Sequence, residues 1–473
     1  MSPVKPKKIA VLGAGLSGLS VAYRLCQKAN VDIEVIERDD RVGGLAKSFE
    51  HNGFTVDLGP HRFHTQNEAV MSEFNGLLGK NQAIKERKSR IYMQGKFFSW
   101  PLVMSEALKS MPISKTFKIG GDYLWARWRY FLLKPEDKSY EDWVVNRFGR
   151  EIFNLFFRDY NAKLWGLKPN EISKDWASQR VSLKGLWDAV VQSVFKPKKQ
   201  ARTNVSRFHY PIKGGIGMLS RMFADQITWQ GGRIVLNTEV TKMESSGDKL
   251  TGISIRNKNT GQSETRNYDY VFSTLPLTKM VEFIAPSAEG KVIEAAQNLK
   301  FKSLIFVYCV INRPKITPDH WIYLPQAELA TNRISEIRNF SEQNVIPGKT
   351  ILCGEISCDF GDPVWRMSTA ELQKKFLGDL SLLKFISQSD LEETFVFREE
   401  FAYPIYDIPY AQNMQKTLAY LKSFKNLTML GRNGLFRYNN MDHCLEMGFK
   451  AADKFLGKDS RYEQVATEDK FFG

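Results

Sequence analysis

The sequence predicts an α/β protein with a Rossmann-like dinucleotide-binding domain, an inserted helical domain and an antiparallel β-sheet domain. Three observations lead to this fold class. Residues 8–44 read as strand, glycine turn, helix and second strand; residues 102–205 follow a helical apolar pattern; and short apolar segments recur between residues 276 and 423. A strand and helix pattern returns after residue 424, so the cofactor domain is expected to be discontinuous.

The opening unit carries the first functional signal. The apolar run 9–12 leads directly into Gly13, Gly15 and Gly18, and apolar residues then recur at helical spacing. Gly13 permits the turn, Gly15 allows the backbone to approach a pyrophosphate, and Gly18 allows close packing of helix on strand. The helix N-terminus offers N–H groups to the phosphates. Glu37 ends the second strand, where an acid accepts hydrogen bonds from ribose hydroxyls, so the unit predicts dinucleotide binding.

The residues after Glu37 indicate which dinucleotide is bound. Arg41, Gly43 and Gly44 extend the motif into an Arg-x-Gly-Gly pattern. This pattern resembles the FAD-binding proteins of the glutathione-reductase-like superfamily, and the resemblance implies FAD as cofactor. The alternative interpretation is a glycine-rich surface turn.

Composition limits the classes of protein. The chain has 473 residues, a net charge of +15 and five scattered cysteines without CxxC spacing, so neither a disulfide framework nor a zinc site is indicated. The positive charge suits a small polyanion, an anionic membrane surface or nucleic acid, and we rank them in that order because no nucleic-acid module is recognisable. Basic clusters lie at residues 85–90 and 196–202. No long apolar run is present, so we expect a soluble, cytoplasmic protein without an integral membrane segment.

A histidine-containing loop follows the opening unit. Residues 54–58 alternate like a short strand, and Gly59 and Pro60 end it, which places His61 near a strand end. Ligands bind at such positions in open α/β sheets. His61 and His64 lack an acidic or cysteine partner nearby in the sequence, so we do not expect a metal site.

The middle of the chain changes from β to helical and back. Residues 91–93 and 97–100 predict a hairpin, and residues 151–165 predict an aromatic helix. The aromatic and basic stretch 123–131 could contact a membrane surface or pack as a helix, and we favour packing. Further strands are expected at 233–240, 250–255, 268–274, 304–310, 321–324, 350–356, 393–397 and 427–430, with a closing helix at about 441–456.

These patterns give a domain division. We expect the FAD-binding domain at 1–84, 206–275 and 424–459, the helical substrate domain at 102–205, the sheet domain at 85–101 and 276–423, and a tail at 460–473.

Five stretches, in the same order along the chain, resemble the UDP-galactopyranose mutase family within the amine-oxidase-like flavoproteins. They are Gly59–Thr65; Tyr160–Gly166, similar to a Tyr-x-x-Lys-x-Trp-Gly segment; Gln179–Val181; Thr331–Ile334 after Trp321; and Tyr403–Pro404 with Gly431–Arg432 and Arg437–Asp442. In that family the reaction is redox-neutral: N5 of reduced FAD attacks the anomeric carbon, a nucleoside diphosphate leaves, and the sugar recloses as a five-membered ring.

The resemblance implies a role for each matching residue. Arg180 and Arg333 would bind the diphosphate through their planar forks, with His61 acting near the flavin. These three are the expected catalytic residues. The expected FAD-binding residues are Gly13, Gly15, Ser17, Gly18, Glu37, Arg38, Gly44, Leu45, His61, Val240, Gly431, Arg432 and Asp442. The expected substrate-binding residues are Phe156, Tyr160, Trp165, Arg180, Trp321, Arg333, Tyr403 and Tyr438.

The resemblance also implies partners. A UDP-sugar would be the substrate and an external reductant such as NAD(P)H would supply electrons, and peripheral membrane contact and a homo-oligomer are compatible with the sequence. Pro60 and Arg62 depart from the loop of many mutases, and this leaves the substrate open. An oxidoreductase of the amine oxidase, protoporphyrinogen oxidase or desaturase type is the second hypothesis, and a non-catalytic flavin-binding protein is the third.

Overall fold

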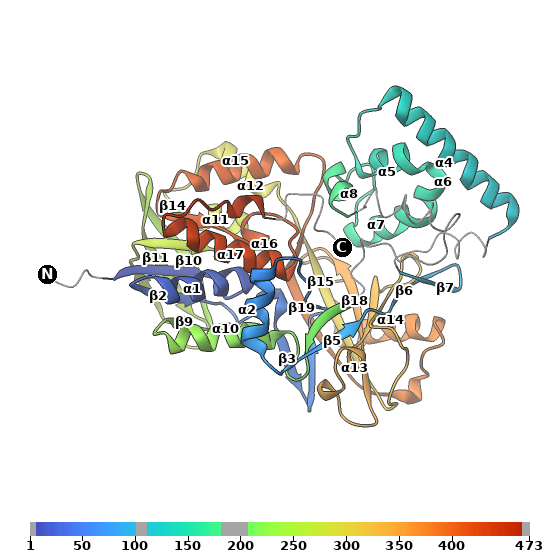
Figure 1. The fold of residues 1–473 in the computed structure, drawn as a ribbon, viewed down its shortest axis with the longest axis horizontal. Helices are drawn as coiled ribbons and strands as arrows, with labels where there is room; N and C mark the ends of the chain where they lie inside the picture. The colour runs from blue at the N-terminus through green and yellow to red at the C-terminus, as the bar shows by residue number, and fades with distance from the viewer. Residues whose placement is uncertain (1–5, 101–110, 181–206, 466–473) are drawn as a thin grey trace. The chain divides into compact units, whose positions relative to one another are not determined.

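A computed structural model describes residues 6–100, 111–180 and 207–465, and the side chains of Gln179 and Arg180 lie outside that description. The chain forms two compact units. Within the described residues, unit 1 comprises the chain up to Ala83, His209–Phe301 and the chain from Ala411, and unit 2 comprises Ile84–Phe208 and Lys302–Tyr410. Each unit is described separately below (Figure 1).

Unit 1 is built on a parallel sheet in the order β20-β13-β1-β2-β9. Its strands are β1 (Lys7–Leu12), β2 (Val31–Ile36), β9 (Arg233–Val235), β13 (Tyr270–Ser273) and β20 (Leu427–Met429). In register, Ile9 lies between Ile33 and Tyr270. Residues 9–12 are fully buried, as expected of a parallel strand covered on both faces, and the predicted strand–helix–strand unit is confirmed.

Helices cover this sheet (Figure 1). They include α1 (Leu16–Lys28), α10 (Gly217–Trp229) and α17 (Met441–Phe455). Helices α1 and α17 cross closely at Gly448, where a Cβ atom would lie only 1.9 Å from Ser20 Oγ. A glycine is therefore required at this crossing, and the helix from the C-terminal part of the chain packs on the first helix.

A second sheet of unit 1 runs in the order β12-β11-β10-β14. The prediction of one strand over residues 233–240 is wrong, because the chain leaves the parallel sheet after β9 and enters this second sheet as β10 (Thr238–Ser246). Asn237 lies between them with φ of +52°, a left-handed conformation that turns the chain and that Asn tolerates.

The remaining elements of unit 1 are η1 (Gly44–Ala46), β3 (Ser48–His51), β4 (Phe54–Asp57), α2 (Glu68–Leu78), β11 (Lys249–Asn257), β12 (Ser263–Arg266), α11 (Leu277–Phe283), β14 (Ile284–Ala285), α12 (Gly290–Gln297), α16 (Gly431–Gly434) and η5 (Tyr462–Gln464).

Unit 2 contains a seven-stranded sheet in the order β19-β15-β18-β17-β16-β6-β7. Its strands are β6 (Ser89–Met93), β7 (Lys96–Ser99), β15 (Phe301–Ile311), β16 (Trp321–Tyr323), β17 (Arg333–Glu336), β18 (Thr350–Cys358) and β19 (Leu391–Pro404). The predicted hairpin of residues 91–100 is confirmed as β6 and β7. The chain passes between the units within the paired strands β5 (Gln82–Glu86) and β8 (Arg207–Pro211), at the start of β15, and at the start of α15 (Tyr410–Lys422).

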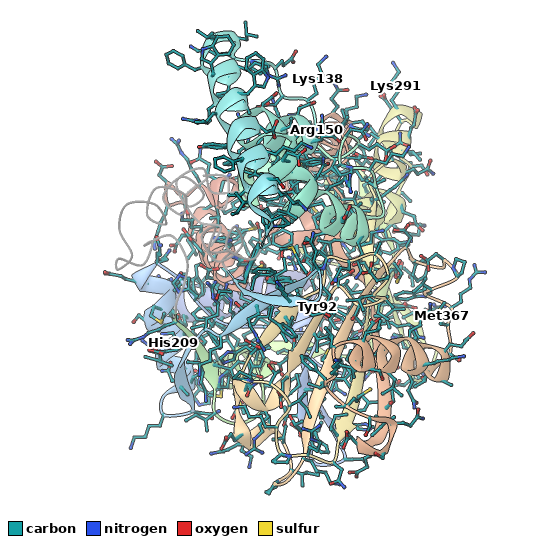
Figure 2. The ribbon with its side chains drawn as sticks, turned by 90° about the vertical axis from the view of Figure 1, so that its right-hand side faces the viewer. Tyr92, Lys138, Arg150, His209, Lys291 and Met367 are labelled. Atoms are coloured by element: carbon teal, nitrogen blue, oxygen red, sulfur yellow. The ribbon has the colours of Figure 1, made fainter. Side chains whose placement is uncertain are left out.

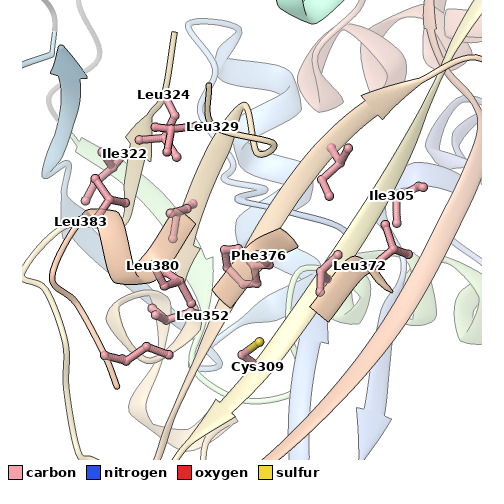
Figure 3. Packing of buried hydrophobic residues seen from close by; sticks show 14 of the residues in the cluster. Ile305, Cys309, Ile322, Leu324, Leu329, Leu352, Leu372, Phe376, Leu380 and Leu383 are labelled. Carbon is pink, nitrogen blue, oxygen red and sulfur yellow. The ribbon is translucent and has the colours of Figure 1, made fainter. Parts of the chain in front are cut away.

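Helix α14 (Thr369–Leu382) packs on this sheet (Figure 3). Leu372, Phe376 and Leu380 are fully buried in a cluster with strand residues such as Ile305 and Leu352. The expectation of a largely β region at 276–423 missed this helix and its neighbours. Its apolar spacing of four and the capping box of Ser368 and Glu371 are the signals that predict it.

The helical segment of unit 2 contains α4 (Ile113–Leu133), α5 (Tyr140–Phe148), α6 (Arg150–Ile152), a π-helical turn η2 (Phe153–Phe157), α7 (Arg158–Trp165) and α8 (Lys174–Arg180). The single helix predicted at residues 151–165 is therefore divided by a π-helical turn, a feature that often marks functional sites. Shorter elements of unit 2 are α13 (Ile337–Phe340), η3 (Glu342–Asn344) and η4 (Gln388–Asp390).

The expectation that the aromatic stretch 123–131 packs against the fold is wrong for its largest side chains. Trp125, Trp128 and Phe131 are 59%, 54% and 78% exposed. Ala126, in contrast, is buried.

Candidate functional site

The first candidate site is the glycine turn of unit 1. Gly13 donates its N–H to Ile36 O at 2.8 Å, and Gly43 donates to Ala14 O at 2.8 Å. A Cβ on Gly18 would lie 2.0 Å from Gly13 O, and a Cβ on Gly44 would lie 3.2 Å from Gly15 Cα. The two glycine segments therefore lie backbone against backbone, which larger residues would prevent.

The N-terminus of α1 is suited to an anion. Gly15 is the N-cap residue and provides no side-chain acceptor, and no acidic residue lies in the first turn. The first-turn N–H groups and the positive end of the helix dipole therefore face the glycine turn without a side-chain cap. This is the arrangement that binds the pyrophosphate of a dinucleotide, so the predicted residues fit FAD.

Glu37 is fixed at the carboxyl end of β2. Its Oε2 accepts from Ala14 N at 2.7 Å and its Oε1 accepts from Asp39 N at 3.0 Å. Each carboxylate oxygen keeps a second acceptor position for a ribose hydroxyl. Burial raises the pKa of Glu37, although these two hydrogen bonds act to lower it. The carboxylate is thus oriented by backbone before any ligand arrives.

Three further predicted FAD residues lie around this strand end. Arg38 forms an ion pair with Asp39 at 3.8 Å, and Leu45 lies in η1. Thr238 N donates to Glu37 O at 2.8 Å, which brings the start of β10 and therefore Val240 toward the end of β2.

The C-terminal part of unit 1 completes the cradle. Ser17 Oγ donates to Cys444 O at 3.0 Å, and Gly431, with φ of +82°, would place a Cβ 3.3 Å from Ser17 Cβ. Asp442 lies in the first turn of α17. Residues predicted for FAD from both ends of the chain therefore meet at the N-terminus of α1.

The histidine loop belongs to the same unit. His61 N donates to Gly59 O at 2.9 Å, and the loop is held by Phe63, which stacks on Phe74 at 4.0 Å. Burial lowers the pKa of His64, while the carboxylate of Asp442 acts in the opposite direction, so the loop and the N-terminus of α17 interact electrostatically. His61 as a catalytic residue stays a prediction.

A second candidate site is an ion pair within unit 2. Arg333 on β17 lies opposite Glu355 on β18. Arg333 Nε lies 2.6 Å from Glu355 Oε1, and Nη2 lies 2.7 Å from Oε2. This fork holds the guanidinium in one plane, and Glu355 raises the pKa of Arg333 despite burial. Nη1 is the nitrogen that Glu355 does not engage.

Tyrosines surround this guanidinium. The Tyr323 ring lies 5.8 Å from the Arg333 guanidinium carbon and makes an edge contact with Tyr160 at 5.8 Å between ring centroids. Burial raises the pKa of Tyr160 well above its usual value, and Tyr323 and Tyr403 add to the rise. Tyr403 in turn contacts Trp165 at 6.1 Å. The structure thus brings together four residues that the resemblance predicts to bind substrate.

Lys163 fixes α7 to the sheet of unit 2. Its Nζ donates to the carbonyl oxygens of Leu324, Gln326 and Thr331 at 2.9, 2.9 and 2.7 Å. Burial lowers the pKa of this ammonium to about 8. Because Tyr160 lies three residues earlier on the same helix, Lys163 determines where Tyr160 is held relative to β16 and β17.

Other predicted residues lie elsewhere. Phe156 packs beside Tyr323 on Ile91, Met93 and Phe98. Trp321 is buried, with ring contacts to His320 and Phe340. Tyr438 belongs to unit 1, where Arg432 lies over its ring at 4.3 Å. The Arg180 side chain and the basic cluster 196–202 lie outside the described residues.

Sequence reasoning missed Glu355, Tyr323 and the anchoring role of Lys163. Lys163 stands in the recognised Tyr-x-x-Lys-x-Trp-Gly segment, so its motif was a usable signal. Glu355 carries no local signal, because it becomes a partner of Arg333 only through strand register. In the described part of the chain, no group of three or more His, Cys, Asp or Glu side chains could hold a metal ion.

The family model described as flavin containing amine oxidoreductase matches residues 16–453. The chain belongs to this family. Membership implies FAD as the cofactor, in agreement with the glycine cradle, and makes the protein an enzyme of the flavin amine-oxidase superfamily.

Relatives within the family include two mutases and an oxidase. The chain is 25% identical over 171 residues to a probable UDP-galactopyranose mutase of Klebsiella pneumoniae and 27% identical over 175 residues to a dTDP-fucopyranose mutase of Escherichia coli. Both alignments cover 35% of this chain and 43% of the relative, so the matched part spans less than half of either mutase. Protoporphyrinogen oxidase 2 of Arabidopsis thaliana is 25% identical over 308 residues, 59% of each chain.

A solved structure of reduced UDP-galactopyranose mutase superposes with a TM-score of 0.84 at 22% identity, covering 98% of this chain and 96% of that chain. The chain therefore has the predicted fold class. The resemblance to the mutases that the motifs indicated is also confirmed.

Proposed function

We propose that this chain is an FAD-dependent mutase that interconverts the pyranose and furanose forms of a nucleotide sugar, most simply a UDP-sugar. The observation that carries the proposal is the Arg333 fork, held by Glu355 among Tyr160, Tyr323 and Tyr403. A fixed cation beside phenolic hydroxyls suits a diphosphate leaving group, and the flat rings suit a nucleobase.

The residues of the two candidate sites would have distinct tasks. The glycine turn, Glu37 and the N-terminus of α1 would hold FAD, which in its reduced form supplies the nucleophile when bound. Arg333 would offer Nη1 to the diphosphate while Nε and Nη2 stay on Glu355. Its charge is then in place before negative charge develops on the leaving oxygen, so no reorganisation is needed during the reaction.

An oxidoreductase acting on a porphyrinogen is the second candidate. The observation that favours it is the longer alignment with the protoporphyrinogen oxidase, 308 residues against 171 for the first mutase. A buried arginine fork has no evident use in removing hydride from such a substrate, so we rank this function below the mutase.

The test is an assay of dithionite-reduced protein with UDP-galactopyranose and a panel of other nucleotide hexoses, with products separated by chromatography. We expect a furanose product from at least one donor and none from oxidised protein. Arg333→Lys keeps the charge but loses the fork, so we expect weaker binding of UDP, read from the flavin spectrum. Arg256→Lys, on the exposed surface of β11, is the matched control and should bind UDP like the wild type.

The proposal is wrong if no donor yields a furanose while the oxidised protein consumes oxygen with a porphyrinogen or an amine. A cytoplasmic location and NAD(P)H as reductant form part of the proposal. Within the described residues, no helix is long and apolar enough to cross a membrane.

A further inference from the structure

Helix α4 presents an apolar face to solvent. The most exposed large apolar side chains of α4 are Ile113, Phe117, Leu124, Trp125, Trp128, Phe131, Leu132 and Leu133. At 3.6 residues per turn, Ile113, Phe117, Leu124, Trp128 and Phe131 fall within an arc of about 60°, and Leu132 and Trp125 widen it to about 120°. Trp125 and Trp128 stack at 5.0 Å and give this face a broad aromatic surface. Leu133 falls on the opposite side, at about 200° from Ile113. We call the other seven residues the α4 apolar face.

The opposite side of α4 is anchored within unit 2. Asp122 Oδ2 accepts from Glu151 N at 2.8 Å, and Arg129 Nη2 donates to Asn146 Oδ1 at 2.5 Å. Arg147 Nη2 donates to Tyr130 OH at 3.0 Å. Figure 2 shows the side chains on the outer side of α4 pointing away from the other helices of this segment. The rotation of the helix is therefore fixed, and it directs the apolar face outward.

Basic residues border the apolar face. Lys118 follows it on one side and Arg127 on the other in the helical projection, and both are exposed. Lys134 lies exposed just beyond the end of the helix. The acidic residue of α4, Asp122, is directed to the Glu151 backbone instead. Lys118 forms an ion pair with Glu151 at 2.8 Å, so the net positive charge of the border comes from Arg127 and Lys134.

We infer that α4 docks unit 2 on an anionic bilayer surface, lying in the interface with its apolar face among the acyl chains. An exposed aromatic and aliphatic face with a lysine and arginine border is the pattern of interfacial helices, and tryptophan prefers that depth. A second copy of this chain is the less favoured occupant, because it would bring two basic-bordered faces of a chain with a net charge of +15 together. The contact is peripheral, since no described helix can span a membrane.

The test uses flotation of the FAD-loaded full chain with vesicles of phosphatidylcholine, with or without phosphatidylglycerol. We expect binding to the vesicles with phosphatidylglycerol and a blue shift of tryptophan emission. Leu124→Gln with Trp128→Gln should lower the partition coefficient about a hundredfold, because each substitution removes a large apolar contact with the bilayer. Trp229→Gln is the matched control, since Trp229 is also exposed, at 82% against 54% for Trp128, but lies at the end of α10.

Arg127→Gln with Lys134→Gln tests the charged border. We expect weaker binding to anionic vesicles and a shallower dependence on salt, with the bound flavin spectrum unchanged. The inference is overturned if the wild type does not float with either vesicle. It is also overturned if Leu124→Gln with Trp128→Gln converts a dimer to a monomer, measured by light scattering, without changing vesicle binding.

Discussion

The ion pair of Arg333 and Glu355 yields a quantitative prediction. Glu355 is 4% exposed and Arg333 is 23% exposed, and the two are joined by two short hydrogen bonds. With charge centres roughly 4 Å apart at an effective dielectric constant of about 20, their attraction is about 4 kcal/mol. Arg333→Met leaves the Glu355 carboxylate buried without its cation, so we expect a loss of about 3–5 kcal/mol in the free energy of unfolding.

The double variant Arg333→Met with Glu355→Leu separates pairing from packing. Removing both charges leaves no buried ion, and we expect a free energy of unfolding within about 1 kcal/mol of that of the wild type. Urea titrations followed by fluorescence, with each transition fitted separately, measure both variants. The matched control is the exposed cross-strand pair of Arg256 and Glu239, where Arg256→Met should cost about 0–1 kcal/mol.

Equal small costs for Arg333→Met and Arg256→Met would refute this reasoning, because they would mean that water screens both pairs alike. A second readout addresses the proposed function. The double variant should fold but lose the flavin spectral response to UDP, since it lacks the arginine. Retained UDP binding in the folded double variant would remove Arg333 from the proposed diphosphate site.

Three further predictions concern the rest of the molecule. Gly18→Ala should abolish FAD retention, measured by the ratio of flavin to protein absorbance, because its Cβ would lie 2.0 Å from Gly13 O; Gly378→Ala in α14, with no atom within 4 Å of the added Cβ, should retain FAD. Burial raises the pKa of Asp57 to about 6, above its usual 3.8, so the native state binds more protons than the unfolded state between these values. The free energy of unfolding should therefore fall as pH rises from about 4 to 6, by up to about 3 kcal/mol. Asp57→Asn should lack this fall in urea titrations across that range, and an unchanged dependence of stability on pH would show that Asp57 is not its source. Lys163→Met leaves three carbonyl groups without their donor and should cost about 1–3 kcal/mol, with faster amide exchange around residues 324–331.

Much of unit 1 follows from local sequence. The run 9–12, the glycines after it and Glu37 each act within one strand–turn–helix–strand unit, so spacing alone predicts their positions, and the structure has them there. The error at residues 233–240 arose because an apolar pattern does not reveal a change of sheet at Asn237. Local patterns indicate strands but do not assign them to sheets.

The substrate-side residues depend on contacts between distant segments. Tyr160 and Arg333 were found by resemblance, but Tyr323 and Glu355 were not, because they reach Arg333 through the register of β16, β17 and β18. Register is set by the whole sheet and the core beneath it. Local sequence motifs therefore predict Arg333 but not Glu355, the carboxylate that orients it.

The sequence by itself determined the glycine cradle, the family motifs and the aromatic and basic character of residues 123–131. Only the tertiary structure decided which way the apolar face of α4 points. Helical periodicity is the same whether an apolar face packs inward or faces solvent, because it records spacing along one helix and not its neighbours. The hydrogen bonds of Asp122, Arg129 and Tyr130 fix the polar side against unit 2, and this leaves the tryptophans outside.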